Sequence, residues 1–200
     1  MKVKRTVIEE TNEFMVGDVI GFELSDGEKV EAMAVRKESD GMVFIFIDCL
    51  ADEYTMNDEY TNKGGYEASD LRKKLNGKIL ERFPERIKNQ LVPFTTNEKG
   101  IISPSKTFLG GDFLRLATEK EIFGENHYGT EEPEYVEQFE PMKQRRNRIA
   151  FQGHNGDWEW WWLQNTVDGS ATSFAYVNSV GNTNDGCAAF SFGVRPCFKL

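Results

Sequence analysis

The sequence predicts an α+β fold, in which an N-terminal β-meander packs with a remainder of mixed helices and strands. Two Asp-Gly dipeptides separate three apolar runs within residues 16–50, a pattern typical of consecutive hairpins because glycine accepts the positive φ of such turns. Helical periodicity with capping residues follows after residue 66. The chain ends in an apolar segment, residues 193–200, which we expect to form a strand in a sheet.

The meander is predicted from Val19–Leu24, Val30–Val35 and Met42–Ile47. The third run is apolar on both faces, which indicates a central, buried strand. Residues 51–65 are acidic and end in glycine, so we expect a loop there.

Two helices are predicted next. The first covers residues 69–76, where Ser69 or Asp70 is the N-cap, Leu71 and Leu75 recur at helical spacing, and Asn76-Gly77 ends the segment. The second covers residues 84–91, with Pro84 at the first helical position and Ile87 and Leu91 as its apolar stripe.

The middle of the chain is predicted to be less regular. Residues 93–111 contain two prolines and a Gly-Gly pair, and Phe113–Leu116 should form a short strand. Thr118 and Glu121 form a capping box for a helical turn that ends at Gly124. A charged loop is expected over residues 125–150. We find no internal repeat, and we place a boundary between a β-rich subdomain, residues 1–60, and an α+β domain, residues 61–200, within one compact unit.

All four tryptophans fall within residues 158–162. If the run is a strand, alternation places Trp158, Trp160 and Trp162 on one face and Trp161 on the other. We interpret the cluster as core, since each indole can bury roughly 150–250 Å². The alternative is a carbohydrate-stacking platform, for which Trp161 is the candidate.

Composition excludes several partners. The 200-residue chain has a formal net charge of −9, which argues against non-specific binding to nucleic acid or to an anionic membrane. Its basic N-terminus lacks the apolar region of a signal peptide, and no apolar run approaches the length of a membrane span. We therefore expect a cytoplasmic protein or a component of a phage particle.

The sequence contains no motif typical of catalytic or metal-binding residues. Cys49, Cys187 and Cys197 cannot all pair, and the simplest interpretation of Cys49 and Cys197 is buried thiols in a reducing compartment. His127 and His154 have no neighbouring nucleophile pattern. Since no zinc-ligand spacing or phosphate loop is present either, we predict a protein that is not an enzyme and has no cofactor or metal.

Two polar features near the C-terminus have competing interpretations. Arg195, inside an apolar segment, should pair with a carboxylate or with backbone carbonyls, and anion binding is the less favoured alternative. Residues 182–185 offer oxygen ligands of the kind that calcium prefers, but a polar turn is the favoured interpretation.

A polar tract between the tryptophans and the last segment predicts a binding surface. Alternation directs Ala175 and Val177 inward and exposes Tyr176 and Asn178, and Tyr with Ser, Thr and Asn supplies adaptable hydrogen bonds around a rigid aromatic contact. Polar surface residues without a partner are an equally weighted alternative. The predicted ligand-binding residues are Asn165, Asp168, Thr172, Ser173, Tyr176, Asn178, Asn182, Asn184 and Asp185, with Trp161.

Several segments resemble an uncharacterised bacterial and prophage domain family. Residues 66–76 are similar to its S-x-L-R-x-x-L-N helix and residues 112–121 to its D-x-x-F-L-L-S-x-x-E segment. The Trp-Trp-Leu, Ala-x-Val and Gly-Val-Arg-Pro segments resemble its ending, in the same order, so the resemblance covers roughly residues 15–200. Gln164-Asn165 replaces the family's usual Arg-Ser, so a role of that arginine does not transfer.

The ending is also similar to C-type lectin-like folds, including formylglycine-generating enzymes and the variable proteins of diversity-generating retroelements. This resemblance implies a C-type lectin-like half over residues 61–200 that displays a polar surface. We therefore expect a non-enzymatic module that binds a protein or carbohydrate ligand. The alternatives are a structural component of a phage particle or surface assembly and, less favoured, a copper-dependent oxidase that uses Cys187 and Cys197.

Overall fold

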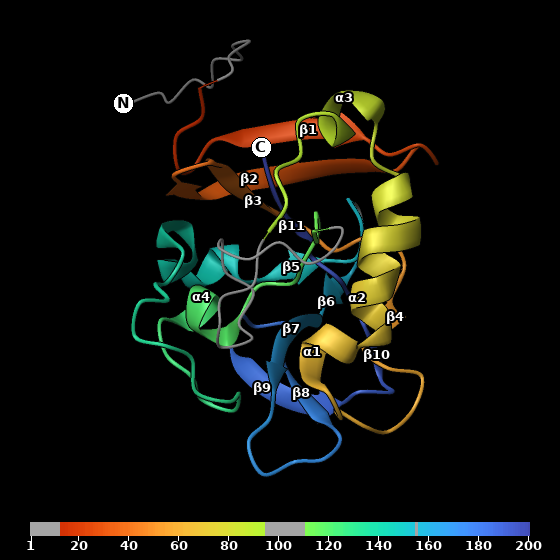
Figure 1. Ribbon diagram of the computed structural model, residues 1–200, viewed down its shortest axis with the longest axis vertical. Helices are drawn as coiled ribbons and strands as arrows, with labels where there is room; N and C mark the ends of the chain where they lie inside the picture. The colour runs from red at the N-terminus through yellow and green to blue at the C-terminus, as the bar shows by residue number, and fades with distance from the viewer. Residues whose placement is uncertain (1–12, 95–110, 155) are drawn as a thin grey trace.

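The largest sheet joins the beginning and the end of the chain. The structure, a computed structural model, describes residues 13–94, 111–154 and 156–200. Strands β1 (Val19–Glu23), β2 (Lys29–Glu38), β3 (Gly41–Phe46) and β11 (Cys197–Lys199) form an antiparallel sheet in the order β1-β2-β3-β11. The predicted meander is therefore confirmed, and the C-terminal strand completes its sheet (Figure 1).

Three smaller antiparallel sheets account for the remaining strands that the structure describes. β4 (Tyr54–Thr55) pairs with β10 (Ser191–Phe192), and β5 (Ala150–Phe151) pairs with β6 (Trp158–Glu159). β7 (Trp161–Thr166), β8 (Ser173–Val177) and β9 (Thr183–Cys187) form a three-stranded sheet at the other end of the molecule from β1 and β2 (Figure 1).

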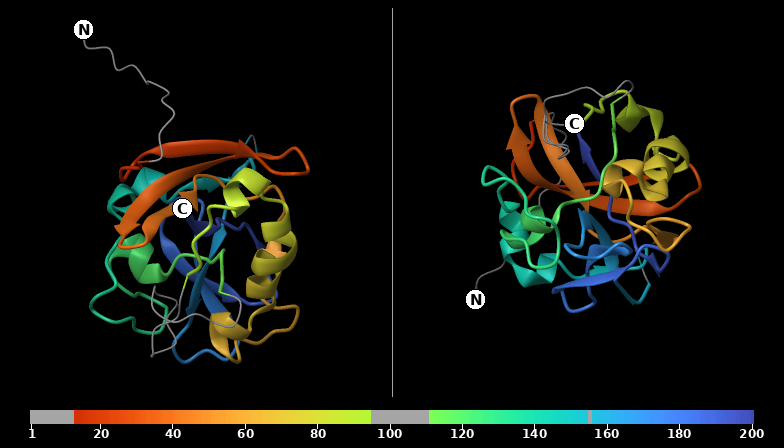
Figure 2. Two further views of the ribbon diagram at one scale, coloured as in Figure 1. Left: turned by 45° about the horizontal axis from the view of Figure 1, so that its top comes forward. Right: turned by 60° about the horizontal axis from the view of Figure 1, so that its bottom comes forward.

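Short helices flank the sheets on two sides (Figure 2). On one side lie α1 (Gly65–Ala68), α2 (Asp70–Lys74), the π-helical turn η1 (Leu75–Ile79) and α3 (Glu85–Lys88). On the other lie α4 (Glu119–Phe123) and the 3₁₀ turns η2 (Glu140–Lys143) and η3 (Arg145–Asn147). The mixture of antiparallel sheets and helices confirms the α+β class. No helix in these described ranges is long and apolar enough to cross a membrane.

The first predicted helix begins as expected but ends later. The Ser69 hydroxyl accepts a hydrogen bond from the Arg72 N–H, so Ser69 is the N-cap. The helix does not end at Gly77, because the buried apolar stripe continues through Leu75 and Ile79. Gly77 lies inside a π-helical turn that joins the two parts. The second helix is shorter than predicted, and Pro84 is its N-cap.

The core is continuous across the predicted boundary near residue 60. Phe44 and Phe46 of β3 pack against Phe198 of β11, with ring centroids 5.4 and 6.1 Å apart. The described residues on the two sides of this boundary thus share a sheet and one hydrophobic cluster.

Four predictions about local structure were wrong. Residues 113–116 pair with β11 only at Arg115, because the backbone bends at Phe113 and the Lys199 carbonyl on that edge of β11 accepts from the Val92 N–H. The expected turn at 182–185 lies largely within β9. The acidic stretch before residue 65 includes β4, and the charged stretch 125–150 includes η2 and η3.

A buried ion pair connects residues 113–116 to α4 and to the β1-β2-β3-β11 sheet. Both guanidinium nitrogens Nη1 and Nη2 of Arg115 donate to the Glu121 carboxylate at 2.6 Å, and Arg36 of β2 lies 3.0 Å from the same carboxylate. Arg115 and Glu121 are both buried. Burial alone would raise the pKa of Glu121, but the charges of Arg115 and Arg36 outweigh it and lower that pKa to about 2.

Replacing Glu121 by Gln should lower the free energy of unfolding by about 3 kcal/mol, because Arg115 then stays buried without a counter-charge. Urea denaturation at pH 7 measures this. Glu140→Gln is the matched control, since it removes a carboxylate from an exposed pair with Lys143 and should change stability by less than about 0.5 kcal/mol. Equal effects of the two substitutions would contradict the assignment.

The contribution of Glu121 should also depend on pH. The pKa is about 2 in the folded protein against an ordinary value of 4.5, so the stabilisation is complete above pH 4.5 and is lost as the pH falls toward 2. The stability difference between wild type and Glu121→Gln should therefore shrink over that interval. A difference at pH 2.5 as large as at pH 7 would contradict this reasoning.

Candidate functional site

The tryptophan run is divided between two sheets. Trp158 belongs to β6 and Trp161 and Trp162 to β7, with Trp160 at the junction. Trp161 and Trp162 are fully buried, whereas Trp158 is 71% and Trp160 is 42% exposed. Trp160 and Trp162 lie on the same face as predicted, since both contact Tyr176 and Phe192. The prediction that the whole cluster is core was wrong for the half-exposed Trp160 and for Trp158, which belongs to β6.

Trp161 is buried and cannot serve as a carbohydrate-stacking platform, so that alternative interpretation of the tryptophan run was wrong. Its indole N–H donates to the Arg148 carbonyl at 2.9 Å, and the Arg195 guanidinium lies 4.5 Å from its ring centroid. The expected backbone partners of Arg195 are confirmed, since it donates to the carbonyls of Phe46 (2.8 Å) and Asn147 (3.2 Å).

Tyr176 is covered rather than exposed. Ala175 and Val177 are buried as predicted, but Tyr176 is only 5% exposed. Trp160 stacks on its ring with centroids 5.3 Å apart and planes inclined by 19°, and Phe192 lies 4.7 Å from it. The face of β8 that alternation assigns to solvent is therefore occupied by aromatic side chains.

Asn165 points away from the rest of the predicted surface. It is buried, its amide oxygen accepts from the Glu119 N–H at 2.7 Å, and its amide nitrogen donates to Glu132 at 3.0 Å. The Thr183 hydroxyl bonds to the same Glu119, so Asn165 and Thr183 lie on one face of the sheet. Asn184, the next residue in β9, faces the opposite side, where it pairs with Tyr176.

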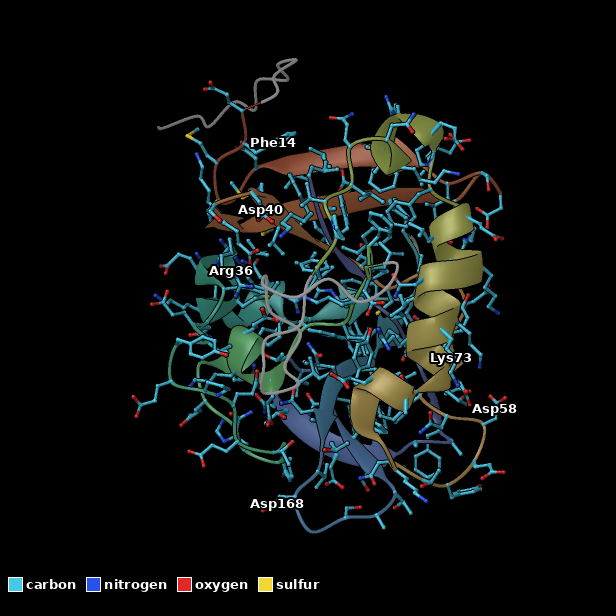
Figure 3. The ribbon with its side chains drawn as sticks, in the orientation of Figure 1. Phe14, Arg36, Asp40, Asp58, Lys73 and Asp168 are labelled. Carbon is cyan, nitrogen blue, oxygen red and sulfur yellow. The ribbon has the colours of Figure 1, made fainter. Side chains whose placement is uncertain are left out.

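The remaining predicted residues are divided between the two ends of the sheet. Asp168 and Thr172 lie in the connection before β8, and Asn178 and Asn182 lie in the turn after it, about 17 Å away along the five residues of the strand. Figure 3 shows Asp168 at the end of the molecule remote from Phe14 and Asp40. Asn178 shapes its own turn, because its side-chain oxygen accepts from the N–H groups of Val180 and Asn182.

The ten predicted residues consequently do not converge on one surface. Ser173 begins β8, and Asp185 is exposed on β9 opposite Ala175. What the fold does assemble is an aromatic shelf, which we define as Trp160, Tyr176, Phe190 and Phe192. Tyr176 and Phe192 are the buried base, and Trp160 and the half-exposed Phe190 are the accessible rings.

The aromatic shelf is packed closely against β9. A Cβ at Gly186 would lie 3.0 Å from the Phe192 ring and 3.2 Å from the Tyr176 ring, so a larger residue would require these rings to shift. Asn184 contacts the Tyr176 hydroxyl, and burial together with the carboxylate of Asp185 raises the pKa of Tyr176. The hydroxyl therefore stays protonated at neutral pH and can donate a hydrogen bond.

The cysteines are dispersed. All three are free, Cys49 and Cys197 are buried as predicted, and burial raises the pKa of Cys197 to about 12. Cys187 lies on β9 and Cys197 on β11, in different sheets. Within residues 13–94, 111–154 and 156–200, no three His, Cys, Asp or Glu residues gather as metal ligands. His127 and His154 are exposed.

Polar residues of the α2–η1 helix bond to the segment 112–116. Arg72 pairs with Asp112 at 2.6 Å. Asn76 accepts from the N–H groups of Phe113 and Leu114 and donates to the Leu114 carbonyl. These groups fasten the α2–η1 helix to residues 112–116, so their role is structural.

Sequence reasoning missed Trp160 as the accessible ring. The signal available was Glu159, the one charged residue inside an otherwise apolar run, which indicates that the run is not continuous core. In the structure Glu159 is partly exposed and its carboxylate accepts from the Trp160 N–H.

Acrylamide quenching should separate the tryptophans into two classes. Replacing Trp158 and Trp160 by Phe should leave blue-shifted emission that acrylamide scarcely quenches, because only the buried Trp161 and Trp162 remain. The single variants provide the controls, and each should retain part of the quenchable emission. Strong quenching of the double variant would show that Trp161 or Trp162 is accessible.

Comparison with known proteins gives one match. The model of a family described as Domain of unknown function (DUF6273) matches residues 40–200, which include β3 and every later element but not β1 or β2. No curated protein and no solved structure matches the chain. Since the match spans most of its length, the chain belongs to this family of unknown function.

Proposed function

We propose that this protein is a non-catalytic module that binds a carbohydrate on the aromatic shelf. The observation that carries the proposal is the Trp160 ring, which is 42% exposed and held parallel to Tyr176. Phe192 supports it further, with its centroid 5.4 Å from that of Trp160. A large aromatic face fixed before binding loses little side-chain entropy when a ligand packs on it.

Polar groups beside the shelf favour a neutral sugar. Asn184 and the exposed Ser191 offer amide and hydroxyl groups that hydrogen-bond to sugar hydroxyls. The exposed Asp185 and the net charge of −9 disfavour an anionic glycan, because like charges repel. A pyranose can stack its apolar face on the Trp160 ring and direct its hydroxyls toward the Asn184 amide.

The same proposal includes a C-type lectin-like half over residues 61–200 and a bacterial or prophage origin. Its support is the pair of buried tryptophans Trp161 and Trp162 within β7 and the return of the last strand to the N-terminal sheet. The absence of catalysis is supported by the separation of Cys187 from Cys197, which disfavours a shared copper or disulfide.

The proposal is tested by screening the purified protein on a glycan array and titrating the strongest neutral glycan by calorimetry. Trp160→Ala should weaken binding at least tenfold, about 1.4 kcal/mol, because it removes the stacking face. Trp158→Ala is the matched control, since Trp158 is more exposed than Trp160 but belongs to β6 rather than to the shelf, and its Kd should change less than twofold.

Three outcomes would contradict the proposal. They are no binding to any neutral glycan, equal losses for the two variants, and a preference for sulfated or sialylated glycans. Concentration-dependent self-assembly without glycan binding would favour the alternative of a structural component of a phage particle or surface assembly.

A further inference from the structure

Two arginines, Arg145 and Arg148, are anchored to the turn that joins β8 to β9. The Nε–H of Arg145 donates to the Val180 carbonyl at 2.6 Å, and the Nε–H of Arg148 donates to the Gly181 carbonyl at 3.0 Å. Since these carbonyls belong to consecutive residues, the two guanidinium groups are held at neighbouring points of one turn. Burial and then the charge of Arg145 lower the pKa of Arg148, as expected of like charges that lie close together.

The anchoring is built into the fold. Gly181 lies so close to η3 that a Cβ there would be 3.0 Å from the Arg145 carbonyl oxygen, and its φ of 76° is one that glycine adopts readily. The Arg148 guanidinium also lies over the Phe123 ring, 4.9 Å from the centroid. Both arginines are therefore positioned before any ligand arrives, so that binding would cost little side-chain entropy.

The anchored arginines retain donors that no protein group uses. Arg145 is exposed and only its Nε is hydrogen-bonded, so its Nη1 and Nη2 atoms form an open fork. Arg148 uses Nε and Nη1, the latter on the Met142 carbonyl at 3.2 Å, whereas its Nη2 has no partner among the described residues and is not fully enclosed. Val180 in the same turn is 48% exposed, so a ligand can approach the turn from solvent.

No carboxylate neutralises the two charges. Within the part of the chain that the structure describes, no Asp or Glu forms an ion pair with Arg145 or Arg148, and the neighbouring Glu140 pairs with Lys143 instead. The chain has 33 acidic and 24 basic residues, so carboxylates are in excess and yet none is placed here. Like charges held together without a counter-ion repel, and a bound anion would relieve that repulsion.

We propose that Arg145 and Arg148 form a binding site for a small phosphate monoester. Near neutral pH its phosphate carries close to two negative charges, which match the two guanidinium groups. The open fork of Arg145 fits two phosphate oxygens, and Nη2 of Arg148 supplies a donor for the third. A carboxylate or a sulfate ester carries a single charge and fits less well. The net charge of −9 disfavours a nucleic acid strand. The site shares no residue with the aromatic shelf and is independent of the carbohydrate proposal.

Glycerol 3-phosphate is the probe, with glycerol and methyl sulfate as its neutral and singly charged counterparts at equal ionic strength. In NMR spectra of the wild-type protein at neutral pH, it should shift the Nε–H signals of Arg145 and Arg148 and the amide signals of Val180 and Gly181. The shifts should saturate, and added salt should weaken them. Glycerol should cause none, and methyl sulfate should bind at least about tenfold more weakly. Equal affinity for methyl sulfate would overturn the proposal, as would shifts confined to other parts of the chain or binding to DNA or anionic vesicles alone.

Arg145→Gln should weaken the binding of glycerol 3-phosphate at least about tenfold, because it removes one charge and the open fork. Arg146→Gln is the matched control, since Arg146 is the exposed neighbour and forms no hydrogen bond to the turn, and Arg86→Gln is the control on α3. Both controls should change the Kd less than about threefold. Equal losses for the three variants would indicate diffuse attraction to basic side chains and overturn the assignment. If Arg145→Gln does not fold, the wild-type shifts decide the question.

Discussion

The buried carboxylate of Glu121 is the point at which four parts of the chain meet. It accepts two hydrogen bonds from Arg115, lies within 3.0 Å of Arg36 on β2, and caps α4 by accepting from the Thr118 N–H. The backbone of Arg115 in turn exchanges two hydrogen bonds with Cys197 of β11. A charge in this position is stable only while all partners stay in place, so the pair couples the N-terminal sheet, the C-terminal strand and α4.

Hydrogen bonds and burial also distinguish structural residues of this chain from residues that a ligand could contact. Arg72 and Asp112 pair with each other, and the buried Arg195 donates to backbone carbonyls of neighbouring segments. The half-exposed Trp160, in contrast, has an accessible ring.

Local chemistry was predictable from the sequence, whereas long-range partners were not. The Asp26-Gly27 turn, the Ser69 cap and the Thr118–Glu121 capping box depend on residues within four positions of one another, and all of them form. The second hairpin also forms, but Gly41 begins β3 and does not adopt a positive φ. The burial of Asn165 depends on Glu119 and Glu132, more than 30 residues away. The exposure of Trp160 depends on a change of sheet within an apolar run, which periodicity does not reveal.

Native-state hydrogen exchange at the amides of Arg115 and Cys197 tests most directly whether the fold depends on the junction that the Arg115–Glu121 ion pair and the Arg115–Cys197 backbone bonds form. Each of these N–H groups donates to the other residue's carbonyl, at 3.0 and 2.7 Å, beside the buried ion pair. If the junction couples the four segments, both amides should exchange only through global unfolding, with an opening free energy equal to that from urea denaturation. Opening free energies several kcal/mol lower, at either amide, would show that the junction opens locally and would contradict the account.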